Sequence, residues 1–359
     1  MKKTILIAGA LGTVGRSALA HFEALPDWDI IAISRRKPDF DTRAQWLSID
    51  LAAGDARQRI QDATGTAAIT HVFYSALFEM DNVVAGWTQW QHVDTNLTML
   101  RAVIEGVEAV APGLRHVTIV HGAKHYGAHL GPFRMPARES DPRAMPPNFY
   151  YPQQDWIAQH QQGKPWAWTV LIPQVIFGEA VGSPLNIVPA LGAFAAVSRE
   201  LGMPLRFPGG AARANEATDA RLIAQAAQWA GDSPAARNQL FNLANGDVYV
   251  WEMLWPKIAR QFNMELGYPQ PFSLARVMPA NGRIWDQMVS KYGLRPLSWQ
   301  QIVPSWQMAD FLFGYGQRPN GHHMSTIKIR KAGFHECQDS EEMILDHLAT
   351  LQRLRYLPT

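Results

Sequence analysis

The sequence predicts an α/β protein, built on a Rossmann-type parallel sheet with helices on both faces and a smaller C-terminal lobe. Three observations predict this class. The first half of the chain alternates short apolar runs with helical patterns. The runs are largely continuous in apolar residues, as in strands buried on both faces, and a glycine-rich segment follows the first run. The expected strands are residues 4–8, 29–34, 71–75, 115–120 and 169–172, with another short strand before Asp50.

The helices of the first half follow from residue spacing. Residues 16–25 continue directly from the glycine-rich segment. A long amphipathic helix is expected over residues 87–107, because apolar residues recur every three or four positions before Pro112-Gly113. Those residues are Trp87, Trp90, Val93, Leu97, Leu100, Ile104 and Val107. The spacing predicts that the two tryptophans pack on the helix and do not form a ligand platform.

The pattern changes after about residue 178, where longer helical segments alternate with Pro- and Gly-containing connections. We therefore expect residues 1–178 to form a dinucleotide-binding Rossmann domain. Residues 179–359 are expected to form a predominantly helical substrate-binding lobe, from which some segments return to the Rossmann sheet. Its expected helices are residues 185–201, 219–230 and 250–262, with an extended segment at 203–207.

Composition narrows the class of protein. The 359 residues are 47% hydrophobic and 18% charged, with a formal charge of +2, so no basic excess points to nucleic acid. The single cysteine, Cys337, excludes an internal disulfide and favours a reducing, cytoplasmic location. The longest apolar stretch, residues 185–197, is shorter than the ~20 residues that span a membrane. Neither a nucleic-acid nor a membrane partner is expected.

The glycine-rich segment predicts a dinucleotide site. Gly9 permits the turn after the first strand, Gly12 lets backbone approach a pyrophosphate, and Gly15 allows the helix to pack closely. The helix N-terminus adds N–H donors and a favourable dipole. The residues expected to bind the cofactor here are Gly9, Leu11, Gly12, Thr13, Val14 and Gly15.

The end of the second strand favours NADP(H) over NAD(H). An NAD enzyme usually carries an acidic residue there, whereas this chain has Ser34, Arg35 and Arg36. Two guanidinium groups can bind a 2′-phosphate through charge-assisted hydrogen bonds, which a carboxylate would repel. Asp50 and Leu51, after the third strand, are expected to flank the adenine.

Lys124 and Tyr151 are the candidate catalytic residues. Tyr151 follows Phe149 and Tyr150, and the fourth residue after it is Asp155 instead of a lysine. A Tyr-x-x-x-Lys spacing would put phenol and ammonium on one helical face, so the spacing is broken here. Lys124 follows the apolar run 115–120, and a strand ending beside the helix would let its ammonium reach the phenol.

These features resemble the short-chain dehydrogenase/reductase superfamily, specifically its progesterone 5β-reductase and iridoid synthase (PRISE) branch. The resemblance rests on four segments whose order and separation fit the family from about residue 4 to about residue 345. They are Gly122-Ala123-Lys124-His125-Tyr126, Asn148-Phe149-Tyr150-Tyr151, Pro173-Gln174-Val175-Ile176-Phe177-Gly178, and residues 251–262 with Asn242 and Asn245 before them.

The resemblance implies an NADPH-dependent reductase that adds hydride to the β-carbon of an α,β-unsaturated ketone or aldehyde. It makes Tyr151 the donor that stabilises the enolate, and Lys124 its partner at the nicotinamide ribose. It places Ser75, Lys124, Tyr151, Pro173, Val175 and Ile176 at the cofactor, and Ala76, Phe78, His125, Tyr126 and Met308 in the substrate pocket. A homodimer is also implied.

The sequence departs from the family around the expected pocket. Smaller side chains follow the fourth strand, Ile172-Pro173 replaces Arg-Pro, and Met308 replaces a phenylalanine. The steroid or monoterpene specificity of the family is therefore not transferred to this chain. The expected substrates are small or medium hydrophobic enones. Two other readings stay open, namely carbonyl reduction or another short-chain dehydrogenase reaction, and a non-enzymatic NADP sensor. No metal site is expected, because His121 and His125 lie across a strand-to-loop transition without a supporting glutamate.

Overall fold

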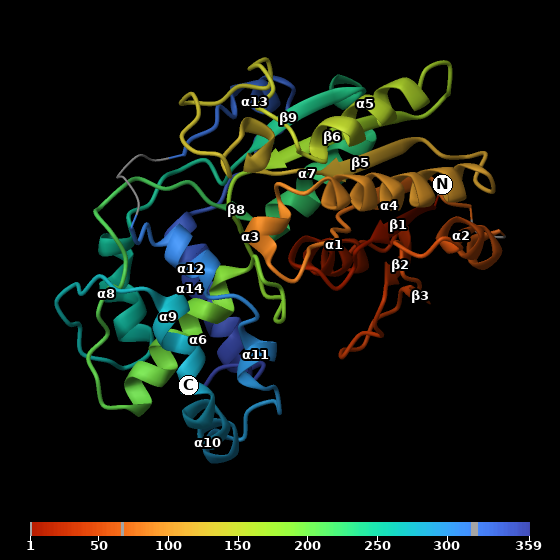
Figure 1. Ribbon diagram of the computed structural model, residues 1–359. Helices are drawn as coiled ribbons and strands as arrows, with labels where there is room; N and C mark the ends of the chain where they lie inside the picture. The colour runs from red at the N-terminus through yellow and green to blue at the C-terminus, as the bar shows by residue number, and fades with distance from the viewer. Residues whose placement is uncertain (1, 66–67, 317–321) are drawn as a thin grey trace. The chain divides into compact units, whose positions relative to one another are not determined.

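The computed structural model describes residues 2–65, 68–316 and 322–359, which form two compact units. The first unit comprises the chain up to Val175 together with Ala220–Ala244 and His323–Cys337. The second comprises Ile176–Asp219, Asn245–His322 and Gln338–Thr359. Figure 1 shows the helices and strands of both units. The first segment of the first unit thus ends three residues before the boundary expected from the sequence, and two later segments rejoin this unit.

A parallel sheet forms the centre of the first unit. Within the described residues it has seven strands in the order β3-β2-β1-β4-β5-β6-β9. The strands are β1 (Lys3–Ala8), β2 (Trp28–Ser34), β3 (Gln45–Ser48), β4 (His71–Tyr74), β5 (His116–Val120), β6 (Ala167–Pro173) and β9 (Gln239–Leu243). All six pairings are parallel. The strand order reverses between β1 and β4, which is where a doubly wound sheet binds its ligand. The α/β fold predicted from the sequence is confirmed.

Helices cover both faces of this sheet. One face packs against α2 (Ala56–Thr64), α4 (Trp90–Glu108) and α5 (Tyr150–His160), and the other against α1 (Thr13–Glu23) and α7 (Ala220–Asp232). Short helices α3 (Val83–Gly86) and α13 (Ile327–Lys331) complete the unit, with 3-10 helices at Ala123–Tyr126 and Pro234–Ala236.

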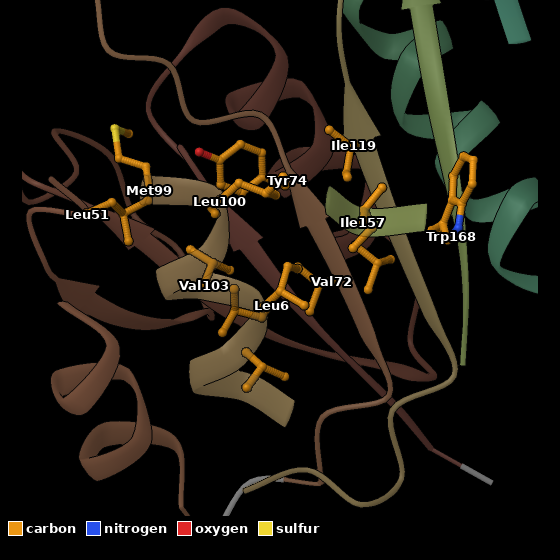
Figure 2. Packing of buried hydrophobic residues seen from close by; sticks show 14 of the residues in the cluster. Leu6, Leu51, Val72, Tyr74, Met99, Leu100, Val103, Ile119, Ile157 and Trp168 are labelled. Atoms are coloured by element: carbon orange, nitrogen blue, oxygen red, sulfur yellow. The ribbon is translucent and has the colours of Figure 1, made fainter. Parts of the chain in front are cut away.

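Figure 2 shows the core beneath α4, where Leu100 and Val103 meet the strand residues Leu6 and Val72. Alternate residues of each strand enter this cluster because successive side chains point to opposite faces. The core therefore fixes which strand residues face each layer of helices.

The second unit is mainly helical. Its helices are α6 (Ile187–Glu200), α8 (Trp251–Gln261), α9 (Leu274–Val277), α10 (Gly282–Tyr292), α11 (Trp299–Ile302), α12 (Gln307–Leu312) and α14 (Ser340–Arg353), with a 3-10 helix at Met278–Asn281 and a parallel pair β7 (Ile176–Phe177) and β8 (Thr218–Asp219). Helix α6 is buried on all sides from Ile187 to Ser198. A Cβ on Gly192 would stand 2.1 Å from Leu357, so this glycine lets the C-terminal segment pack against α6.

The helix expected over residues 87–107 was wrong at its start and in the packing of its tryptophans. Helix α4 begins at Trp90, and Trp87 instead is the C-cap residue that follows the short helix α3. Neither tryptophan packs as the spacing predicted, because Trp90 is 60% exposed and Trp87 turns its ring toward a lysine. Strand β9 was not expected. The segment expected to be extended at 203–207 forms no named strand among the described residues, but Leu205 pairs with Leu266 as an isolated bridge and Phe207 accepts a backbone bond from Gln270.

Among the residues with described structure, no helix is both long and apolar enough to cross a membrane.

Candidate active site

The glycine-rich segment forms a tight loop between β1 and α1. Gly9 adopts φ +87°, and a Cβ there would lie 2.7 Å from the backbone of Ala76, at the end of β4. A Cβ on Gly15 would lie 2.1 Å from the carbonyl oxygen of Gly9. Both positions therefore need glycine, one to bring the loop against the segment after β4 and the other to bring α1 against the loop.

The start of α1 fits an anionic ligand. Gly12 is exposed, and a Cβ there would meet only the Gly9 carbonyl, at 3.4 Å. No side chain caps the helix, and its first turn holds no acidic residue. The hydroxyl oxygen of Thr13 is buried without a hydrogen bond to a described residue. Uncapped N–H groups and a spare hydroxyl at a positive helix end are the donors that a pyrophosphate requires. Leu11 and Val14 lie within the same turn.

The basic turn after β2 is held by its backbone. Ser48 and the Trp46 indole, both on β3, donate hydrogen bonds to the carbonyl oxygens of Arg35 (2.9 Å) and Arg36 (3.1 Å). Both arginines are exposed, and neither forms an ion pair with another described residue. Their guanidinium groups are thus available to an anion beside β2, while Ser34 ends that strand half-buried.

The other residues expected at the cofactor occupy different settings. Asp50 is exposed and Leu51 is buried in the core that Figure 2 shows. Ser75 follows β4 and bonds to the Ala8 carbonyl through its amide and its hydroxyl. The remaining three are Pro173, which ends β6, Val175, which ends the first segment of the first unit, and Ile176, which belongs to the second unit.

Lys124 lies on the 3-10 helix that follows β5, with its ammonium in a largely apolar setting. The Nζ atom is buried, with no hydrogen bond to a described residue. It stands 4.3 Å from the ring centre of Trp87 and 5.9 Å from that of Tyr150. Its nearest acidic atom is Oε1 of Glu79, at 3.9 Å. Burial lowers the pKa of Lys124 to about 8, although the charge of Glu79 acts in the opposite direction.

The two consecutive tyrosines of α5 have different surroundings. Tyr151 donates its hydroxyl to the carbonyl of His125 and accepts from the amide of Ala144, both at 2.8 Å. The Tyr150 hydroxyl has no hydrogen bond to a described residue and lies 3.1 Å from where a Cβ on Gly122 would stand. Because consecutive helical residues point about 100° apart, only one can turn toward Lys124. The structure brings Lys124 together with Tyr150, whereas Tyr151 ties the loop before α5 to the helix.

Burial raises the pKa of Tyr150, and the nearby charge of Glu79 raises it further. Its phenol is therefore protonated at neutral pH and can donate a hydrogen bond. The His121 ring stacks on Tyr150, with 4.3 Å between ring centres. Burial also lowers the pKa of His121 well below its usual value, so this neighbour is neutral.

One amide sets the position of Tyr150 relative to Lys124. Asn148 donates from Nδ2 to the carbonyl oxygen of Lys124 at 2.6 Å, and its Oδ1 accepts from the amide of Tyr150 at 3.1 Å. The side chain therefore joins the turn after β5 to the first residue of α5. At the fourth position after Tyr151, Asp155 forms a two-pronged ion pair with Arg143 (2.5 and 2.7 Å). That pair adds to the connection that Tyr151 makes between the loop before α5 and the helix.

The expected pocket residues are not all available to a substrate. Ala76 and Phe78 follow β4 and are half-buried. His125 is buried against Tyr126 and Tyr151. Tyr126 lies in the hydrophobic core, and its hydroxyl donates to Asn242 at 2.5 Å, so its expected pocket role is not supported. Met308 lies on α12 of the second unit.

Two residues near Lys124 were not identified from the sequence as site residues. Glu79 follows β4 within a segment interpreted only as carrying smaller side chains, and Trp87 was assigned to helix packing. A carboxylate shortly after a strand end in an otherwise apolar run was the available signal. His121 and His125 stack with 5.9 Å between ring centres, and the described residues contain no group of three or more metal-ligating side chains.

Comparison with known proteins identifies the family to which the chain belongs. Residues 50–312 match the PRISE-like Rossmann-fold domain. An (S)-8-oxocitronellyl enol synthase of Camptotheca acuminata is 31% identical over 98% of this chain and 93% of its own length. A 3-oxo-Δ(4,5)-steroid 5β-reductase of Arabidopsis thaliana is also 31% identical, over 98% of this chain and 92% of its own length.

Among solved structures, a UDP-glucose 4-epimerase of Thermotoga maritima aligns with a TM-score of 0.68. The alignment covers 98% of this chain and 99% of that one at 12% identity, and this likeness concerns the fold alone. The family match spans most of the chain, and the two plant relatives extend the likeness to nearly all of it. The chain therefore belongs to the family of PRISE-like Rossmann-fold proteins.

Proposed function

We propose that the protein is an NADPH-dependent reductase that adds hydride to the β-carbon of an enone or enal, with Tyr150 and Lys124 at the carbonyl oxygen. The observation that carries the proposal is the protonated phenol of Tyr150, free of hydrogen bonds to described residues, beside the buried ammonium of Lys124. The broader class, an oxidoreductase acting on a carbon–carbon double bond, follows from relatives that include a steroid 5β-reductase and enol synthases.

The residues present fit a dinucleotide. The loop from Gly9 to Gly15 and the spare Thr13 hydroxyl suit a pyrophosphate, and the guanidinium groups of Arg35 and Arg36 suit a 2′-phosphate. When bound, NADPH would supply the hydride. The protein's own task is to hold the two reactants and to stabilise the charge that develops on the substrate oxygen.

Addition of hydride at the β-carbon moves negative charge to the carbonyl oxygen and gives an enolate, and a proton taken from solvent at the α-carbon completes the saturated product. A donor placed at that oxygen stabilises the transition state more than the ground state. Tyr150 has this donor, because its hydroxyl is protonated and makes no hydrogen bond to another described residue. Lys124 supplies a positive charge nearby and three N–H donors, none of which bonds to a described residue. Tyr151 lacks this freedom, since its hydroxyl already bonds to two backbone groups.

The substrate is proposed to be a small or medium hydrophobic enone, in contact with Ala76 and Phe78 beyond the end of β4. The test is NADPH oxidation with a panel of cyclic and linear enones, followed by identification of the product. Saturated carbonyl products support ene reduction. Allylic alcohols would assign the protein to carbonyl reduction, and tight NADPH binding without turnover would favour a sensor.

Cofactor preference provides one prediction. Replacing Arg35 and Arg36 together by alanine is expected to weaken NADPH binding about 10–100-fold, because hydrogen bonds to charged groups contribute about 1.5–3 kcal/mol. Binding of NADH should stay within about twofold, since it lacks the 2′-phosphate. Titration by nucleotide fluorescence measures both affinities. The neighbouring exposed Lys37→Ala is the control for loss of positive charge, and equal weakening for both nucleotides would contradict the assignment.

The pH dependence gives a second prediction. The pKa of Lys124 is lowered to about 8 by burial, and the proposal requires its charged form. The ammonium is present below that pKa and is lost as the pH rises through it, so kcat/KM should fall about tenfold per pH unit above pH ~8. The measurement is kcat/KM from about pH 6 to pH 10. The Lys124→Arg variant, whose side chain stays charged, should lack this decline, and a decline that persists there would assign it to another group.

Two other parts of the proposal come from the sequence and from family resemblance. A cytoplasmic location is proposed on the single, exposed Cys337. A homodimer is proposed on the resemblance, and light scattering of the purified protein would measure its mass.

A further inference from the structure

The loop after β4 places a largely buried carboxylate next to Lys124. The side chain of Glu79 is 12% exposed and that of Lys124 is 14% exposed. Their closest charged atoms, Oε1 and Nζ, are 3.9 Å apart, beyond hydrogen-bond length but close enough for a strong interaction between charges. The carboxylate therefore acts on the ammonium without occupying any of its three N–H donors.

Neighbouring side chains hold the carboxylate in place. The indole N–H of Trp87 donates to both oxygens of Glu79, at 3.1 and 3.2 Å. His92 of α4 also lies next to the carboxylate, with Nε2 3.2 Å from Oε2. The preceding residue, Phe78, is fixed through its backbone, since the buried amide of Asn96 bonds to both its N–H and its carbonyl oxygen. The direction of the carboxylate is thus set by α4 and by the end of α3.

Trp87 contacts both members of the pair. Its ring lies 4.3 Å from the Lys124 ammonium, while its N–H bonds to Glu79. An ammonium over an aromatic face is stabilised electrostatically, and more so when water is excluded. The face of the Trp87 ring therefore stabilises the Lys124 ammonium directly. Its N–H does so indirectly, by holding the Glu79 carboxylate.

Among the described residues, Glu79 is the one anion whose charge acts on Lys124. The other titratable groups nearby are His92 of α4, His129 after the 3-10 helix, and Tyr150 of α5. Burial lowers the pKa of His129 to about 4 and raises the pKa of Tyr150, so both are neutral near neutral pH. Neither can replace the counter-charge that Glu79 provides.

We propose that Glu79 is a positioning residue, which keeps Lys124 charged in its buried site and leaves all three ammonium donors available to the cofactor and the substrate oxygen. The role rests on the proposed reductase function, because only a catalytic Lys124 needs a charge without a bonded protein partner. Trp87 has a supporting part, in that its N–H fixes the carboxylate. The geometry that carries this inference is the 3.9 Å separation together with the shared indole.

The test is a pH titration of Lys124 in the full-length, cofactor-free protein. The titration is monitored by NMR of lysine labelled with carbon-13 at Cε. Lys124→Arg assigns the signal. In Glu79→Gln the midpoint is expected to fall by about one pH unit, because an opposite charge at this distance shifts a pKa by about 1–3 units. Glu79→Asp should restore part of that shift. Asp81→Asn removes an exposed carboxylate from the same loop and should leave the midpoint unchanged.

Kinetics then separate positioning from folding. At about pH 6, Glu79→Gln should catalyse enone reduction at nearly the wild-type rate. As the pH rises, its activity should fall at a lower pH than that of the wild type, and the difference should equal the shift of the Lys124 NMR midpoint. A purely structural role would lower activity equally at every pH. Trp87→Phe keeps an aromatic ring beside Lys124 and removes the indole N–H, so its midpoint should lie between those of the wild type and Glu79→Gln.

An unchanged Lys124 midpoint in both Glu79→Gln and Trp87→Phe would overturn the inference. Absence of enone reduction in the wild type, with the midpoint shifted as expected, would instead overturn the proposed function and leave the effect of Glu79 on Lys124 standing. The two failures are therefore distinguishable.

Discussion

The Tyr150→Phe substitution is expected to lower kcat/KM about 100–1000-fold, the usual cost of losing one oxyanion donor. Stability should change little, because the Tyr150 hydroxyl makes no hydrogen bond to another described residue. Reduction of an enone by NADPH measures the first quantity, and urea unfolding measures the second. The loss should be confined mainly to kcat, since the bond is needed most when charge has developed on the oxygen.

Tyr151→Phe is the matched control, one position along the same helix. It removes the partner of the His125 carbonyl and of the Ala144 amide, so the free energy of unfolding should fall by about 1–3 kcal/mol. Activity should stay within several-fold of the wild type. The reverse pattern, with activity lost in Tyr151→Phe and kept in Tyr150→Phe, would return the catalytic role to Tyr151.

Gly15→Ala is expected to weaken NADPH binding by at least about 100-fold. The new Cβ would stand 2.1 Å from the Gly9 carbonyl, so the loop or the helix must shift. Moving the loop misaligns the N–H groups at the start of α1, and each charge-assisted hydrogen bond lost contributes about 1.5–3 kcal/mol. Equilibrium titration with NADPH, supported by thermal unfolding, measures the effect.

Gly113→Ala is the control for this change. Gly113 lies in the same unit, has no positive φ, and a Cβ there meets nothing within 4 Å. Its NADPH affinity and midpoint of unfolding should match those of the wild type. Normal NADPH affinity in a folded Gly15→Ala protein would mean that the pyrophosphate does not lie on this loop.

Much of the fold could be predicted, because the apolar pattern that marks each buried strand lies within a short stretch of sequence. Strands β1, β2, β4, β5 and β6 are largely apolar, since both faces of the sheet are covered, and that pattern can be recognised without knowing which strands pair. Strand β9 could not be found in this way, because Gln239-Leu240-Phe241-Asn242-Leu243 mixes polar and apolar residues at the edge of the sheet. Its place depends on pairing with β6, far away in the sequence.

The sequence predicted which segments form the site, but not which side chains contact one another there. Lys124 and the tyrosine pair were found, since a strand end and a helix start converge there. Which tyrosine faces the lysine depends on the rotation of α5, which the bonds of Asn148 and Tyr151 determine. Glu79 was missed because its partners, Trp87, His92 and Lys124, come from three separate segments. Sequence spacing describes one element at a time and cannot reveal contacts between side chains of different segments.

Asn148 has an evolutionary consequence. When phenol and ammonium share one helix, the helical pitch dictates their separation, and neither can move without the other. In this protein the two groups belong to different segments that a single amide joins. Insertions in the loop between them can therefore accumulate, provided that this amide keeps both its bonds. Grafting that loop from another member of the family, with Asn148 retained, should therefore leave Tyr150 and Lys124 aligned.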